Sequence, residues 1–102
     1  MVQKVRQTSR HISTEWEILM PKPRTSSGEK NLISSRLIEL RKQQNLSQRD
    51  LAHKLQLAGY DMDKNVITRI ETNKRYVTDI ELRALSEVLG VSYAFLIDGK
   101  EK

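Results

Sequence analysis

Apolar side chains recur at helical spacing through the last two thirds of the chain. Ile33, Leu37 and Leu40 fall at i, i+4 and i+7, which predicts a helix that begins after Asn31 and buries this stripe. The polar residues 43–45 end this helix. The same pattern leaves its charged residues facing water: Glu39, Arg41 and Lys42.

A second helix is predicted over residues 48–57. Ser47 precedes Asp50 by three positions, so the Ser47 hydroxyl can accept an amide proton at the start of the helix while Asp50 reaches back. We expect its buried face to consist of Leu51, Ala52 and Leu55.

The third helical segment has two contrasting faces. Asp63 is a plausible N-cap, and the apolar stripe that follows is expected to point inward: Val66, Ile67 and Ile70. The residues left outside are Lys64, Asn65, Thr68 and Arg69. Asn73 closes the segment, and asparagine is one of the few residues other than glycine that tolerates the left-handed conformation.

Two further helices complete the pattern. Thr78 and Glu81 repeat the capping-box spacing, and Gly90 marks the end of that helix. Its inward residues are Leu82, Leu85 and Leu89. A last short helix begins at Ser92 and carries Tyr93, Leu96 and Ile97. Five short helices predict an all-α domain.

Composition changes near residue 30. Residues 20–31 hold both prolines and several small polar residues, which favours a solvated linker. We therefore predict a mobile basic arm over residues 1–30, a folded domain over 31–99 and a tail over 100–102. Thr14 and Glu17 have capping-box spacing, although EWEILM could equally form a short strand. Trp16, Ile18 and Leu19 could dock on the domain or on a partner.

Charge and residue types narrow the possible functions. The net charge is +5, with six Lys or Arg against three Glu in residues 1–30 and twelve against ten acids afterwards. The chain has no cysteine, two histidines (His11 and His53) and no phosphate-binding glycine loop, so we expect no metal site, no cofactor and no enzyme activity. No apolar run is long enough to cross a bilayer, and we expect a cytoplasmic protein.

Three motifs in order resemble those of one known family. RLIELRKQQNLSQRDLAHKL, ITRIETNKR and LRALSEVLGVSYAFLIDG make residues 32–99 similar to the phage repressor and Cro-like helix-turn-helix family, also called the XRE family. The resemblance implies a compact five-helix domain of the lambda-repressor type, with its third helix in the major groove of double-stranded DNA.

The resemblance also implies roles for single residues. Lys64, Asn65, Thr68 and Arg69 match positions that face base edges, and Lys, Arg and Asn are suited to guanine and adenine there. Ser47 and Gln48 match positions at the DNA backbone, and Arg36 and Glu71 match a structural ion pair. Beyond the third helix, a second group could bind phosphate or merely solvate a turn: Lys74, Arg75 and Tyr76.

Two departures from the family pattern stand out. The connection LQLAGYDMDKN is about five residues longer than the family's usual tight turn, so we expect a small loop or an extra helical turn at Gly59 and Tyr60. This length puts the angle of the third helix on DNA in doubt. Asn73 stands where the family often has glycine.

We therefore expect a sequence-specific transcriptional regulator, a repressor that binds operator DNA as a homodimer. Tyr93 and Phe95 are candidate dimer contacts, although Phe95 could equally complete the core. The alternative is an antitoxin or other protein-interaction module of the same fold, whose partner binds through the N-terminal arm. An enzyme would need clustered acids or a nucleophile and base, and here the acids are scattered.

Overall fold

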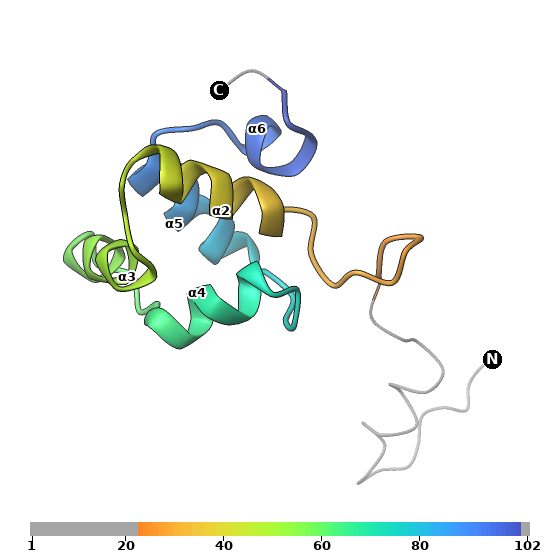
Figure 1. Ribbon diagram of the computed structural model, residues 1–102, viewed down its shortest axis with the longest axis horizontal. Helices are drawn as coiled ribbons and strands as arrows, with labels where there is room; N and C mark the ends of the chain where they lie inside the picture. Colours follow the sequence, from red (N-terminus) through yellow and green to blue (C-terminus); the bar gives the residue numbers. More distant parts are fainter. Residues whose placement is uncertain (1–22, 101–102) are drawn as a thin grey trace, which may run out of the picture.

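The computed structural model describes residues 23–100, and this part of the chain forms five helices and no strand. In chain order they are α2 (Ser34–Gln43), α3 (Gln48–Leu57), α4 (Lys64–Glu71), α5 (Asp79–Leu89) and α6 (Tyr93–Asp98). In Figure 1, α2 crosses over α5, α3 and α4 lie on one side of this pair, and α6 lies on the other. The predicted all-α architecture is confirmed.

The core lies where the inner faces of the helices meet. The predicted stripes supply it: Leu37 and Leu40 from α2, Leu51, Ala52 and Leu55 from α3, Ile67 and Ile70 from α4, and Leu85 and Leu89 from α5 are buried. Val66 and Leu82 are half-buried and pack against this core. Helix spacing alone therefore identified most of the residues that hold the domain together.

Side-chain caps begin four of the five helices, and three of these caps, at Ser47, Asp63 and Thr78, were predicted. Ser47 and Thr78 form capping boxes at α3 and α5, while Asp63 and Ser92 accept backbone N–H groups at α4 and α6. These bonds satisfy amides that have no partner inside the helix. The caps fix where each helix begins, and so set the lengths of the turns between them.

Two asparagines end helices where glycine is common. Asn45 after α2 and Asn73 after α4 adopt the left-handed conformation, with φ of 56° and 60°. After α4, the Asn73 amide donates to the Ile70 carbonyl and the Lys74 amide donates to the Arg69 carbonyl, the two bonds of a Schellman motif. The prediction that Asn73 closes its helix in this conformation is confirmed.

The long connection between α3 and α4 is a loop that Tyr60 and Met62 attach to the rest of the domain. Gly59 turns the chain with φ of 96°, and the buried Met62 inserts into the core. The Tyr60 hydroxyl donates to the Glu87 carboxylate on α5, which raises the pKa of Tyr60. Of the two predicted forms, a small loop and an extra helical turn, the structure has the loop.

The chain before α2 is bonded to the turn after α4. The Lys30 and Asn31 amides both donate to the Asn73 side-chain oxygen, at 2.7 and 3.1 Å. The side-chain nitrogen of the buried Asn31, Nδ2, donates to the Ile70 and Arg75 carbonyls. These contacts join the start of the domain to the end of α4.

None of these helices, which lie within residues 23–100, has the length and apolar character needed to cross a membrane.

Candidate nucleic-acid interface

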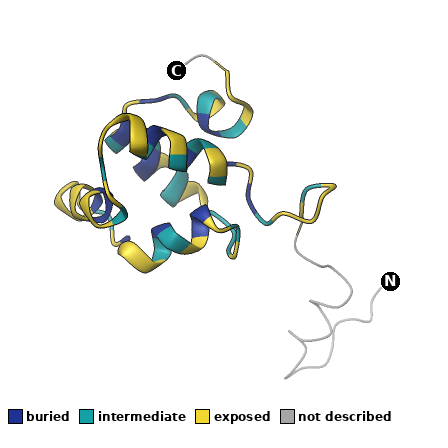
Figure 2. Ribbon diagram, viewed as in Figure 1, coloured by how far each residue is buried: buried dark blue, intermediate teal, exposed yellow. Residues whose placement is uncertain are grey.

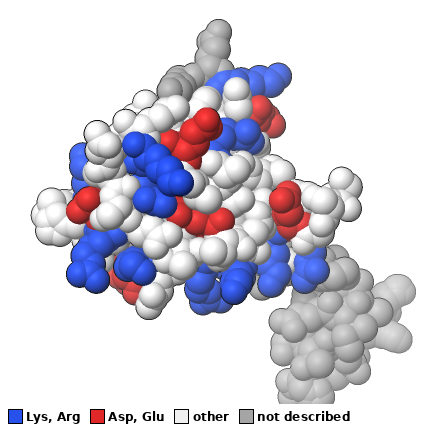
Figure 3. Space-filling view, viewed as in Figure 1, with Lys and Arg blue, Asp and Glu red and all other residues white. Residues whose placement is uncertain are grey.

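The outward face of α4 carries the residues predicted to read DNA bases. Lys64, Asn65 and Arg69 are exposed, and Figure 2 shows the exposed first turn of α4 on the side away from the core. In Figure 3, Lys and Arg gather along the lower edge of the domain, where α4 and the turn after it lie. One edge of the molecule thus presents hydrogen-bonding and basic groups together.

Thr68 occupies a different position from its three neighbours. Its side chain is half-buried, and its hydroxyl lies 2.8 Å from the Gln48 side-chain oxygen and 2.9 Å from the Lys64 carbonyl. The hydroxyl hydrogen is therefore used inside the protein. What Thr68 can still offer to a base is its methyl group, which suits the methyl group of thymine.

Gln48 connects α3 to α4 at the start of α3. Its oxygen accepts the Thr68 bond, and its nitrogen donates to Glu71 Oε1 at 2.8 Å. An amide nitrogen carries two hydrogens, so one N–H of Gln48 can still be donated outward. Gln48 therefore braces α4 directly, because both its partners, Thr68 and Glu71, lie on that helix.

Arg41 of α2 forms the ion pair with Glu71 of α4. The prediction that Arg36 forms this pair was therefore wrong. Arg41 Nε lies 2.7 Å from Glu71 Oε2, and Arg41 Nη2 lies 3.0 Å from Glu71 Oε1. The two side chains are only 13% and 4% exposed. The hydrogen bond to Glu71 raises the pKa of Arg41. The expectation that Arg41 faces water was also wrong.

Arg36 contacts a different helix. Its guanidinium donates to the carbonyls of Leu96 at 2.9 Å and Ile97 at 2.7 Å, in α6. Carbonyls in the last turn of a helix lack partners within it, and a cation there is favourable. Arg36 therefore holds the C-terminal helix against α2 and takes no part in the site on α4.

The sequence did contain a signal for Arg41 that was missed. Arg41 follows Leu37 by four positions and Leu40 by one, which places it at the edge of the buried stripe and not opposite to it. Arg36 lies on the other edge of the same stripe. Helical spacing places both arginines beside the core, but it does not say which neighbouring helix each one reaches.

The start of α3 offers backbone N–H groups beside Gln48. Ser47 is exposed and caps this helix, with its hydroxyl accepting from the Asp50 amide at 2.9 Å. The Ser47 amide donates to Asp50, and this bond, together with the Ser47 hydroxyl, holds the pKa of Asp50 below its usual value. A helix N-terminus is a favourable place for a phosphate, although the Asp50 charge here opposes one.

The three predicted phosphate contacts after α4 differ in their surroundings. Lys74 is exposed. Arg75 is half-buried and donates to Glu81 Oε2 at 2.9 Å, so the protein itself uses its charge. The Tyr76 hydroxyl accepts a long hydrogen bond of 3.4 Å from Arg24 Nε. The structure thus leaves Lys74 as the exposed basic side chain of this group.

The two candidate dimer contacts, Tyr93 and Phe95, differ in their exposure to solvent. Tyr93 is 49% exposed at the start of α6, whereas Phe95 is half-buried and packs against the core. Of the two expectations for Phe95, the structure favours the one in which it completes the core. Tyr93 lies beside Tyr60, Ile80 and Arg83 around a surface hollow of about 470 Å³.

Comparison with known families agrees with this architecture. A family model described as "Helix-turn-helix" matches residues 37–96, which is more than half of the chain. The chain therefore belongs to this helix-turn-helix family, whose XRE and Cro-like members are DNA-binding transcription regulators. Comparison with curated proteins and with solved structures finds no significant match.

Proposed function

We propose that this protein is a sequence-specific repressor that acts in the cytoplasm and binds operator DNA through α4. The observation that carries the proposal is the contrast between the two faces of α4. Its inner face is bonded to α2 and α3 through Arg41, Gln48 and Glu71, while Lys64, Asn65 and Arg69 stand free of the core. A rigidly held helix with an exposed polar face is what reading of the major groove requires.

The proposed base contacts follow from side-chain chemistry. Lys64 and Arg69 suit guanine O6 and N7, and Asn65 can pair bidentately with adenine N6 and N7. Thr68 would offer its methyl group, for the reason given above. For the backbone, we assign phosphate contacts to Ser47, Gln48 and Lys74, with Gln48 using its remaining N–H.

The lengthened loop does not weaken this assignment. Met62 and Tyr60 attach the loop to the core and to α5, and the cap at Asp63 then starts α4. The orientation of α4 is set by its bonds to Arg41 and Gln48, which do not depend on the length of the preceding turn. The longer loop is therefore compatible with an α4 that these bonds hold in place.

Repression by occlusion is the mechanism we propose. A homodimer would place two copies of α4 about 34 Å apart on one face of the duplex and read a palindrome. Bound there, it would exclude polymerase from the promoter. The basic residues Lys4, Arg6 and Arg10, which lie outside the described residues, would add phosphate attraction that is independent of sequence.

The proposal is tested by selecting bound sequences from a random duplex pool, with the wild-type protein and with Arg69→Ala. We expect a palindromic motif whose preference at one position per half-site falls by about 1–3 kcal/mol in the variant, because one bidentate contact is lost. Lys100→Ala is the matched control, since Lys100 is exposed and closely follows α6, which lies on the other side of α2 and α5 from α4 (Figure 1).

Neutralising Lys4, Arg6 and Arg10 should have a different effect. All duplexes should bind more weakly, and the slope of log K against log salt should fall by about 0.9 for each phosphate contact removed. If this triple variant and Arg69→Ala lost sequence preference equally, α4 would not be the reading element. If no motif were recovered at all, the protein-interaction alternative would replace the repressor.

A further inference from the structure

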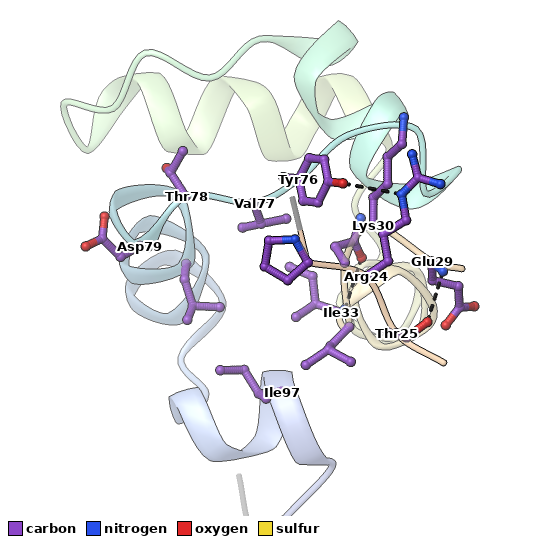
Figure 4. Close-up of a pocket in the computed structure, with 14 residues that line it drawn as sticks. Arg24, Thr25, Glu29, Lys30, Ile33, Tyr76, Val77, Thr78, Asp79 and Ile97 are labelled. Atoms are coloured by element: carbon purple, nitrogen blue, oxygen red, sulfur yellow. Dashed lines mark hydrogen bonds between the residues drawn. The ribbon is translucent and has the colours of Figure 1, made fainter. Parts of the chain in front are cut away.

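An apolar groove lies on the side of the domain where its described chain begins. It has a volume of about 530 Å³ and is formed by residues of the segment 23–33 before α2, the turn 76–78, the start of α5 and one residue of α6 (Figure 4). Its apolar lining comes from residues far apart in the sequence: Leu32, Ile33, Val77, Leu82 and Ile97. Leu32 is 53% exposed, so apolar surface is open to solvent here.

The start of the described chain is fastened to the mouth of this groove. Pro23 and Arg24 line it, and Arg24 Nε donates to the Tyr76 hydroxyl on the opposite wall. Between Thr25 and Glu29 the chain makes a hydrogen-bonded turn, and the Lys30 amide then bonds to Asn73. Figure 4 shows Arg24 and Tyr76 side by side among the lining side chains. The part of the chain upstream of Pro23 is therefore tethered at the groove.

The nearest apolar run of the chain lies just upstream. Trp16, Ile18 and Leu19 fall outside the described residues, and Leu19 precedes Pro23 by four positions. Four residues span at most about 14 Å, so the run cannot move far from the mouth. A short tether of this kind gives an effective concentration in the millimolar range.

The size of the groove favours this segment as the occupant, and the charged rim of the groove is balanced in sign. A groove of a few hundred Å³ is large enough for a tryptophan ring and an aliphatic neighbour, which together bring large apolar area. The acidic residues Glu15 and Glu17 flank Trp16, and the groove carries the basic residues Arg24 and Lys30 on its rim beside the acids Glu29 and Asp79.

We propose that Trp16, with Ile18 and Leu19, docks in this groove of its own chain and anchors the N-terminal arm to the domain. This inference goes beyond DNA binding and does not depend on it, because the groove and the tether exist in the protein alone.

The experiment uses the fluorescence of Trp16, the one tryptophan of the chain, in the full-length protein without DNA. In the wild type, we expect emission at shorter wavelength than that of a water-exposed indole and several-fold weaker quenching by acrylamide. Leu32→Asp should move the emission to longer wavelength and restore quenching. Leu57→Asp is the matched control, because Leu57 is 75% exposed on α3 and does not line the groove.

Each other outcome overturns the proposal. A water-exposed Trp16 in the wild type, or equal effects of Leu32→Asp and Leu57→Asp, would show that the groove is not its site. A blue shift that disappears on dilution would show docking on a second copy. Circular dichroism checks that the variants fold. Leu32→Gln introduces no charge, and it should also move the emission of Trp16 to longer wavelength if the polarity of the side chain, and not its charge, is the cause.

Discussion

Arg36 and Arg41 lie on the two edges of one buried stripe of α2 and serve opposite sides of the domain. Arg36 donates to carbonyls of α6, and Arg41 pairs with Glu71 of α4. Both arginines can form these contacts because a guanidinium has five donors in a fixed plane and can reach past the rim of the core. Each arginine replaces an apolar contact by directed bonds, which fix the orientation of the helix it meets.

Arg41→Met should be among the most destabilising substitutions in the chain. It leaves the Glu71 carboxylate, whose side chain is 4% exposed, without its guanidinium partner. Breaking a buried pair from one side typically costs about 3–5 kcal/mol, whereas replacing both partners by apolar residues is often nearly neutral. We therefore expect the double variant Arg41→Met with Glu71→Met to recover much of the loss in urea unfolding.

Arg75→Met provides the comparison. Its partner Glu81 is 15% exposed and Arg75 itself 24%, so solvent screens this pair more and the loss should be about 1 kcal/mol. If Arg75→Met were as costly as Arg41→Met, or if the double variant were no more stable than Arg41→Met alone, the buried pair would not be what holds α4.

At the scale of elements, the caps decide where each helix begins. The box at the start of α3 is reciprocal, since the Ser47 amide donates to the Asp50 carboxylate and the Asp50 amide donates to the Ser47 hydroxyl. The same arrangement at Thr78 and Glu81 begins α5. Because α3 begins with Gln48, the cap also sets the position from which Gln48 reaches α4.

The Asp50 cap makes stability depend on pH in a definite direction. Hydrogen bonds from Ser47 hold the pKa of Asp50 below its ordinary value of 3.8, so the folded state favours the ionised form. This contribution is complete above pH 3.8 and is lost as the pH falls through the lower folded pKa. In Asp50→Asn we expect the free energy of unfolding to fall less steeply below pH 4 than in the wild type.

The measurement is urea unfolding of both proteins between pH 2 and pH 6, the range in which carboxylates titrate. Asp61→Asn is a suitable control, because Asp61 is exposed in the loop before α4. An acid slope unchanged in Asp50→Asn, or changed equally in Asp61→Asn, would contradict the assigned role of the cap.

At the scale of the whole molecule, the surface around Tyr93 lies on a different part of the domain from α4. Ile80 is 66% exposed and Tyr93 49% exposed, and they share a hollow with Tyr60 and Arg83. Asp79 lines the same hollow as Arg83, so the patch carries both charges and can face a copy of itself across a two-fold axis. We place the proposed dimer contact here.

Ile80→Asp should convert the proposed dimer to a monomer while leaving the fold intact, because aspartate is favourable in the first turn of a helix. Binding to a palindrome should weaken strongly, and binding to a half-site should not change. Sedimentation velocity and titration of the two duplexes measure this. The idea fails if Ile80→Asp stays dimeric, or if Leu57→Asp, at a leucine on α3 that is 75% exposed, has the same effect.

Local chemistry made much of this protein predictable from its sequence. Apolar spacing identified the five helices and most of the core, and the capping positions of Ser47, Asp63 and Thr78 identified where three of them begin. These features depend on residues within one turn of each other. The exposed face of α4 followed from the same spacing, although its contacts with bases remain a prediction.

Contacts between distant residues were decided by the tertiary structure alone. That Glu71 pairs with Arg41 and not Arg36, that Met62 fills the core from a loop, and that Asn73 bonds to the chain before α2 all depend on how the helices pack. Periodicity places a side chain on a face, but it does not determine which distant element covers that face. The sequence alone therefore determined the helices and the residues that α4 presents to solvent, and packing decided which bonds hold α4 in place.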